Sequence, residues 1–212
     1  CYDSFGCNPR MIRRKPAQES FREHILLLRE FVRAPLSTAT IAPSSRHLAH
    51  RMALSVELEK AKTVVELGPG TGALTSELLR RLRHDAQFLA VELNPVLAAD
   101  WQRQFPRHDV AVGSVADLRQ ICTDHQMDHV DCIVSALPWP SFPSELQESG
   151  LEEVVDVLRP GGQMVTFGYH VGMLMPSGRN FVRLIEQKFR RVERLKWVWR
   201  NLPPAYILRC TK

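Results

Sequence analysis

The chain has 212 residues, of which 44% are hydrophobic and 24% charged, and these fractions are typical of a folded domain with a core of its own. The sequence contains no apolar run of about 18 residues and no signal-peptide pattern, so we expect no transmembrane segment. The formal net charge of +5 suits an anionic partner, either nucleic acid or an acidic lipid surface. The five cysteines are scattered without metal-ligand spacing, which favours reduced thiols in a cytosol, and we expect no bound metal.

Two segments are expected to precede the main domain. Residues 1–18 are polar with a cluster of Arg and Lys, and we interpret them as a mobile basic arm. Residues 19–45 are interpreted as an N-terminal amphipathic helical segment, because apolar residues such as Phe21 and Leu28 recur there at helical spacing. Such a helix can lie in a membrane interface or pack on the domain as a lid, and the sequence leaves both open.

Residues 46–212 are expected to form one domain in which strands and helices alternate. Its first helix is predicted to start after Ser44 or Ser45 as the N-cap. Strands are predicted at Thr63–Leu67, Gln87–Glu92, Asp109–Val112, Cys132–Ala136 and Gln163–Phe167. Helices are predicted at Thr75–Arg83, Pro95–Gln104, Leu151–Leu158 and Asn180–Phe189. This alternation is typical of an α/β fold with a doubly wound, Rossmann-like, mostly parallel sheet.

The C-terminal third carries two further signals. The run LRPGG at 158–162 is interpreted as a helix end with a glycine turn into the next strand. Two β-rich runs, RVERLKWVWR and AYILRC, predict an antiparallel strand pair at the end of the sheet. Trp197 and Trp199 of the first run are expected in the sheet core.

The run VVELGPGTGALT places a glycine turn between a strand and a helix, where backbone amides can approach a ligand. Its glycines also fit the dinucleotide-binding fingerprint, so the turn alone does not identify the ligand. Glu66 decides between the candidates, because its carboxylate would repel a pyrophosphate and attract cationic groups. S-adenosylmethionine carries a sulfonium and an ammonium group and no phosphate. Glu92 ends the following strand, where its carboxylate can accept hydrogen bonds from both ribose hydroxyls.

Together with the later run AVELNP, this turn resembles that of the class I S-adenosylmethionine-dependent methyltransferases. The resemblance implies that the glycine loop lines the methionine portion of the cofactor, a role that falls on Gly68, Gly70 and Gly72. It also implies that Glu92 holds the ribose, and Glu66 would face the methionine end.

Three more residues complete the expected cofactor site. Ser114 and Val115, in the run AVGSVADL, are expected to flank the adenine, with Asp117 as the competing candidate. Ser135, at the end of the fourth predicted strand, is placed beside the cofactor.

The loop after that strand indicates which kind of group is methylated. In methyltransferases that act on adenine, this position commonly reads Asn-Pro-Pro-Tyr or Asn-Leu-Pro-Tyr, and the amide holds the base amine. Here the loop reads Ala136-Leu137-Pro138-Trp139, so the aromatic residue is kept and the amide is gone. An unpaired base amine in a buried site costs about 1–3 kcal/mol, which counts against an adenine substrate.

Several separated motifs in order resemble the bacterial phospholipid N-methyltransferases: REFVRAPLSTATIAPSSRHLAHRMA, ELGPGTGALT, VSALPWPSFP, LRPGGQMVTFGY and VWRNLPPAYILR. The resemblance implies methylation of the amine of phosphatidylethanolamine or of an ornithine lipid. It also implies an anionic membrane surface as partner and a cytoplasmic protein peripherally associated with the inner membrane.

A lipid amine is mostly protonated near neutral pH and must lose a proton before it attacks. Tyr169 and His170 are the candidate proton acceptors, with Glu66 behind them. Trp139 is a candidate wall for the cationic product through cation–π attraction. Two alternatives stay open: an RNA adenine N-methyltransferase, which the basic charge favours, and a catalytically silent methyltransferase-like binding module.

Overall fold

The computed structural model describes residues 46–169, 175–195, 197–199 and 204–212. The predicted basic arm and N-terminal amphipathic segment lie outside the described residues, and so does His170.

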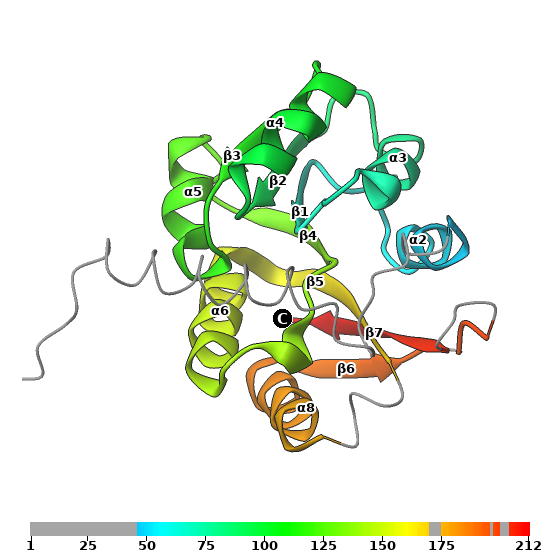
Figure 1. Ribbon diagram of the computed structural model, residues 1–212, viewed down its shortest axis with the longest axis vertical. Coiled ribbons are helices and arrows are strands. Elements are labelled where there is room, and N and C mark those ends of the chain that lie inside the picture. The colour runs from blue at the N-terminus through cyan, green and yellow to red at the C-terminus, as the bar shows by residue number, and fades with distance from the viewer. Residues whose placement is uncertain (1–45, 170–174, 196, 200–203) are drawn as a thin grey trace, which may run out of the picture. The chain divides into compact units, whose positions relative to one another are not determined.

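A seven-stranded sheet forms the centre of the described domain (Figure 1). The strands are β1 Thr63–Leu67, β2 Gln87–Glu92, β3 Asp109–Val112, β4 Val130–Ser135, β5 Leu158–Tyr169, β6 Arg191–Arg194 and β7 Ala205–Thr211. Their order is β3-β2-β1-β4-β5-β7-β6. The neighbours from β3 to β5 are parallel, and β7 is antiparallel to both β5 and β6. The predicted mostly parallel α/β sheet with an antiparallel C-terminal strand pair is confirmed.

Helices cover both faces of this sheet (Figure 1). The described ones are α2 Arg46–Ala53, α3 Ala73–Leu79, α4 Pro95–Gln104, α5 Leu118–Asp124, α6 Ser144–Val157 and α8 Pro176–Lys188, with short 3-10 turns η1 Val115–Asp117 and η2 Trp139–Ser141. Apolar residues of α2, α3 and α4 form one core with side chains such as Val64 and Val134. On the opposite face, α6 packs against both α5 and α8 (Figure 1). The inner strand β1 is buried from Val64 to Leu67, as expected for a strand covered on both sides.

Local sequence explains where several elements begin. Asn94 caps α4, because its side chain accepts a hydrogen bond from Val96 N at 2.9 Å, and Pro95 follows at the first helical position. Strands β1, β2 and β3 and helix α4 have the bounds that the sequence predicted.

Strand β4 and helices α3 and α8 are shifted by a few residues from their predicted bounds, and other elements differ more. Strand β5 begins at Leu158, because the glycine turn is a bulge inside the strand: Val130 and Cys132 of β4 pair with Leu158 and Gln163. Gly161 in this bulge has a φ of 76°. Helix α6 begins at Ser144, earlier than predicted, and α5 was not predicted at all.

The expectation for the two C-terminal tryptophans is wrong for Trp199. Its side chain is 74% exposed, although Val198 beside it is buried and bridges to Ala205. The chain alternates faces at this point, so burial of Val198 turns its neighbour outward. Trp197 packs on Trp199, with ring centroids 5.7 Å apart, and on the ring of Tyr206.

Candidate functional site

The carboxyl ends of four parallel strands bring the predicted cofactor residues to one edge of the sheet (Figure 1). Leu67 at the end of β1 pairs with Val91 of β2 and with Ser135 of β4, and Glu92 pairs with Val112 of β3. The glycine turn after β1 therefore lies between Glu92 on one side and Ser135 on the other. Ligands of open parallel sheets bind at this edge.

The glycine turn needs its glycines for two different reasons. Gly68, Gly70 and Gly72 all have positive φ values, of 69°, 53° and 79°, in a region that disfavours other residues. Space is tight at two of them: an added Cβ would lie 2.8 Å from Leu137 Cδ2 at Gly68 and 2.4 Å from Phe105 Cε2 at Gly72. At Gly70 an added Cβ would meet no atom of the described residues within 4 Å, which leaves space beside its backbone.

Replacing Gly72 by Ala is expected to destabilise the fold by about 2–4 kcal/mol, since it adds a clash with Phe105 to the cost of a left-handed alanine. Urea unfolding measures the change. Gly161→Ala is the matched control, because Gly161 has a similar φ of 76° but its nearest neighbour, Arg159 Nη1, is 3.7 Å away. Equal losses in the two variants would contradict the packing role of Gly72.

Glu92 fastens the glycine turn to the end of β2. Its Oε2 accepts a hydrogen bond from Gly70 N at 3.2 Å, and its Oε1 accepts one from Asn94 N at 3.0 Å. The side chain is buried, and burial raises the pKa of Glu92, although these backbone N–H groups act in the opposite direction. An acceptor-only carboxylate thus stands where a ligand on the turn would meet it.

Glu66 is a fully buried carboxyl group at the heart of the same edge. Thr75 Oγ1 donates to Glu66 Oε2 at 2.6 Å, and Trp101 Nε1 donates to Thr75 Oγ1 at 2.9 Å. Its other oxygen, Oε1, has no hydrogen-bond partner among the described residues. Burial raises the pKa of Glu66 to about 8; the Thr75 hydrogen bond lowers it, and the charge of Glu92 raises it further.

These two acids define what can bind on the turn. An orphaned buried oxygen is costly and is relieved by a donor or a cation. Glu66 and Glu92 disfavour each other's charge, so a cationic group near them would be favoured and an anionic pyrophosphate disfavoured. S-adenosylmethionine, with its sulfonium and ammonium groups and its ribose hydroxyls, matches both carboxyl groups.

The predicted adenine side lies after β3. Ser114 is buried and caps η1, where its Oγ accepts a hydrogen bond from Ala116 N at 3.2 Å. Val115 is 7% exposed, and an added Cβ on Gly150 would lie 2.9 Å from its Cγ1, so α6 packs behind it. Asp117, the competing candidate, is exposed at the start of α5.

The structure packs Ser135 and Trp139 against each other. Both are 0% exposed, and Ser135 Oγ accepts hydrogen bonds from Trp139 Nε1 at 2.9 Å and from Leu137 N at 3.3 Å. The Trp139 ring stacks on Phe181 at a centroid distance of 5.4 Å and meets Phe142 edge-on. Its indole is therefore enclosed in the packing of the loop after β4.

Tyr169 ends β5 and is half-buried, with its ring edge-on to Phe167 at 5.5 Å. It thus lies at the same edge of the sheet as Ser135, because Ser135 pairs with Thr166 of β5.

Sequence reasoning did not single out Thr75, Trp101 or Gln147, all of which make buried hydrogen bonds next to the site. Thr75 stands in the glycine motif, where its spacing from Glu66 was a usable signal.

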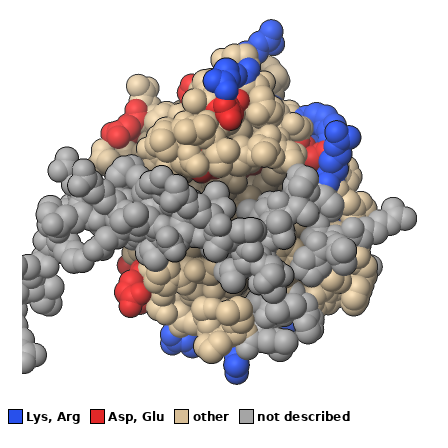
Figure 2. All heavy atoms as spheres, viewed as in Figure 1, with Lys and Arg blue, Asp and Glu red and all other residues tan. Residues whose placement is uncertain are grey.

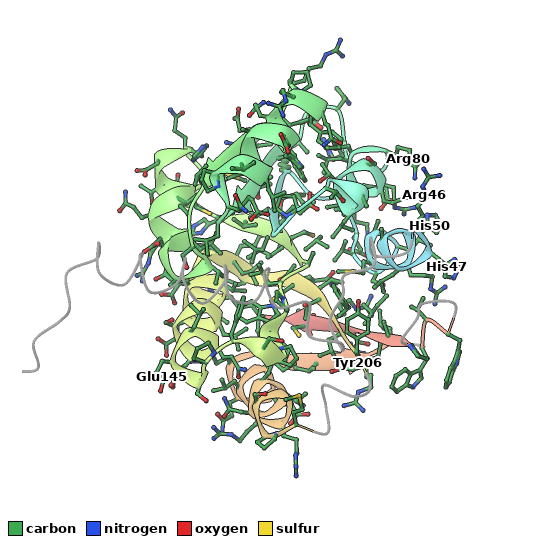
Figure 3. All side chains as sticks on the ribbon, in the orientation of Figure 1. Arg46, His47, His50, Arg80, Glu145 and Tyr206 are labelled. Carbon is green, nitrogen blue, oxygen red and sulfur yellow. The ribbon has the colours of Figure 1, made fainter. Side chains whose placement is uncertain are left out.

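A basic surface lies on the side of the domain formed by α2 and α3. Figure 3 shows Arg46, His47 and His50 of α2 and Arg80 of α3 on the same side, and Figure 2 shows Lys and Arg atoms gathered there. These four residues, here called the α2–α3 basic surface, are all exposed. Glu77 lies among them and contacts both His50 and Arg80. Within the described ranges, no helix is long and apolar enough to cross a membrane.

Comparison with known proteins gives matches in sequence and in structure. Residues 64–162 match a methyltransferase domain family. The ornithine lipid N-methyltransferase of Singulisphaera acidiphila is 31% identical over 191 residues, which cover 79% of this chain and 100% of that protein.

Two solved structures show the same fold. An O-methyltransferase from Bacillus cereus in complex with S-adenosylhomocysteine has a TM-score of 0.62 at 16% identity, with coverage of 96% of this chain and 94% of that chain. The O-methyltransferase TomG from Streptomyces achromogenes in complex with S-adenosylmethionine has a TM-score of 0.61 at 17% identity, with coverage of 92% and 90%.

Proposed function

Because the chain belongs to the S-adenosylmethionine-dependent methyltransferases, we propose that it methylates the amine head group of a membrane lipid, phosphatidylethanolamine or an ornithine lipid. S-adenosylmethionine is its methyl donor, and the sulfonium supplies an already activated methyl group. The observation that carries the proposal is the similarity to an ornithine lipid N-methyltransferase over that relative's whole length. This relative makes the ornithine lipid the favoured substrate of the two.

The donor would be held by the residues at the carboxyl edge of β1, β2 and β3. The turn from Gly68 to Gly72 presents its backbone to the methionine portion, and the Glu92 carboxylate accepts hydrogen bonds from the ribose hydroxyls. Glu66 faces the cationic end, and its Oε1, which has no hydrogen-bond partner in the described part of the chain, supports this role. Ser114 and Val115 flank the adenine from the end of β3.

The acceptor would approach over the loop after β4. Ala136 stands where adenine methyltransferases carry an amide, and it has no side-chain group to hold a planar base amine. A lipid amine does not require such a planar clamp. Because its ring is enclosed, Trp139 serves in this proposal to fix the loop, and contact with the cationic head group falls to other aromatic residues such as Tyr169.

The protein's own tasks are alignment, exclusion of water and removal of one proton. Methyl transfer is an in-line displacement, so the amine nitrogen must lie opposite the sulfur with a free electron pair. An ammonium head group has no such pair until it loses a proton. Tyr169 and His170 are the proposed acceptors of this proton. Tyr169 ends β5 at the same edge of the sheet as Ser135, and His170 follows it in sequence.

The proposed site of action is the surface of an anionic membrane. The α2–α3 basic surface suits anionic head groups through Arg46 and Arg80, because a Lys or Arg near an anionic leaflet contributes about 1 kcal/mol. Trp199 is 74% exposed, and tryptophan favours the interface between lipid and water. The amphipathic pattern at 19–45 points the same way. We place the enzyme at the cytoplasmic face of the inner membrane.

A panel of acceptors tests the proposal. The protein is incubated with methyl-labelled S-adenosylmethionine and either anionic vesicles that contain phosphatidylethanolamine, vesicles that contain ornithine lipid, or RNA. We expect label in a lipid fraction and none in RNA. Label in RNA alone would replace the lipid assignment by RNA methylation, and label in no pool would favour a silent binding module.

A further inference from the structure

A buried amide joins the loop after β4 to the start of α8. Gln147 of α6 is 0% exposed. Its Nε2 lies 2.9 Å from the carbonyl oxygen of Trp139 and 3.1 Å from that of Phe142, both in the loop after β4. The same nitrogen lies 3.3 Å from the carbonyl oxygen of Ser177 in the first turn of α8. One side chain therefore holds two segments that are distant in sequence.

The direction of these hydrogen bonds is fixed from the surface inward. Arg183 Nη2 donates to Asn180 Oδ1 at 2.8 Å, and a guanidinium group can only donate. Asn180 must therefore turn its Nδ2 toward Gln147 Oε1, which lies 3.0 Å away. Gln147 is left with its NH₂ group facing the three carbonyls. Each bond in this chain of donors polarises the next, so the orientation of the buried amide is strongly determined.

The loop that Gln147 holds is also packed by the same two helices. Phe181 of α8 stacks on the Trp139 ring at an interplanar angle of 12°. Gly150 of α6 lies beneath the same ring, because an added Cβ there would be 3.3 Å from Trp139 Cζ3. Helices α6 and α8 therefore set the position of the loop together, and Gln147 with Asn180 forms the polar connection between them.

One of the two segments joined in this way begins beside the proposed donor site, and the other follows in sequence the strand that ends in Tyr169. The loop begins after Ser135, which pairs with Leu67 immediately before the glycine turn. Helix α8 follows Tyr169 of β5 after a short connection. The loop thus neighbours the donor site, and α8 continues the segment that carries the proposed proton acceptors.

We propose that Gln147 and Asn180 are positioning residues for methyl transfer, which hold the loop after β4 and the start of α8 at one separation so that the acceptor amine aligns with the donor. The inference rests on the proposed function of this site. Transfer between two bound groups is sensitive to distance, and a displacement of about 1 Å can cost roughly 100-fold in rate. Neither residue touches the reacting atoms in this account.

Gln147→Glu and Asn180→Asp test the proposal, because each replaces a donating NH₂ group by a carboxylate of nearly the same shape. We expect kcat to fall about 10- to 100-fold while the Kd for S-adenosylmethionine changes by less than about twofold. Amide hydrogen exchange should speed up together in residues 136–143 and 176–182. Gln102→Glu is the matched control: Gln102 Nε2 donates to the His108 carbonyl at 3.0 Å, away from the acceptor edge, and its loss should leave kcat unchanged.

The outcomes separate this inference from the proposed function. Folded variants with an unchanged kcat, or with faster exchange in only one of the two segments, would overturn the positioning role. A wild-type enzyme that methylates no lipid amine would refute the proposed substrate instead. In that case kcat is measured with the acceptor that takes up label, and hydrogen exchange in the two segments still decides the positioning role. If Gln147→Glu does not fold, Asn180→Asp, at the half-buried end of the chain of donors, supplies both readouts.

Discussion

Replacing Glu92 by Ala is expected to weaken binding of S-adenosylmethionine by roughly 100-fold or more. Without the carboxylate, the complex would lose two hydrogen bonds from the ribose hydroxyls, and hydrogen bonds to a charged group contribute about 1.5–3 kcal/mol each. The substitution would also release Gly70 N, which the carboxylate now holds at 3.2 Å, so the glycine turn would lose its connection to β2. Isothermal titration calorimetry with the purified protein measures the change in Kd.

Two further variants separate the ribose role of Glu92 from the general effect of removing a carboxylate. Glu92→Gln keeps one accepting oxygen and should lose less affinity than the alanine variant. Glu153→Ala removes a carboxylate that also accepts a backbone hydrogen bond, from Arg119 N at 2.7 Å, but lies on α6 outside the cofactor edge. Its affinity for the donor should match that of the wild type. An unchanged Kd in Glu92→Ala would remove Glu92 from the ribose site.

Glu66→Gln is expected to change how both folding and cofactor binding depend on pH. The pKa of Glu66 in the folded protein is about 8 against an ordinary value of 4.5, so the folded protein holds this proton more tightly than the unfolded chain. The resulting stabilisation is complete below the ordinary pKa and is lost as the pH rises through the folded value. Between the ordinary and the folded pKa, the free energy of unfolding of the wild type should fall by roughly 3–5 kcal/mol, and that of the glutamine variant should not. Urea unfolding at several pH values measures this difference.

Cofactor binding supplies a second readout for the same residue. In the protein without a ligand, Glu66 is mostly protonated at neutral pH. The ammonium and sulfonium groups of the donor favour its ionised form. Wild-type binding at pH 7 should therefore release close to one proton more than binding to Glu66→Gln. Calorimetry in buffers of different ionisation enthalpy counts these protons. Equal proton release by the two proteins would show that Glu66 serves the Thr75 and Trp101 network and does not meet the cationic ligand.

The fold could be predicted closely where sequence signals are local. Strands β1 and β2 are short runs rich in apolar residues with clear turn signals, and the Asn94-Pro95 pair marks the start of α4. The start of β5 could not be predicted in this way, because the bulge at 158–162 depends on pairing with β4. Likewise, the first turn of α6 is polar in sequence, and the burial of Gln147 in that turn could not be predicted because it depends on packing against α8.

The proposed cofactor site was more accessible to sequence reasoning than the proposed site of the lipid amine. In a parallel sheet the residues that end neighbouring strands meet at one edge, so the chain order alone brings Glu92 next to the glycine turn. The interior of the loop after β4 follows a different logic. Gln147 and Asn180 are 33 residues apart, and only the packing of two helices brings them together. For the same reason the enclosed ring of Trp139 was not predictable.

The substrate assignment is tested most directly by the chemical identity of the product. The enzyme is incubated with S-adenosylmethionine and anionic vesicles in which ornithine lipid carries the only amine, and the recovered lipid is fragmented in a mass spectrometer. The account predicts that the lipid gains methyl groups on the ornithine amine, and that Glu92→Ala abolishes this gain at limiting donor. A lipid of unchanged mass, from an enzyme shown to bind the donor and to methylate a different acceptor such as RNA, would contradict it.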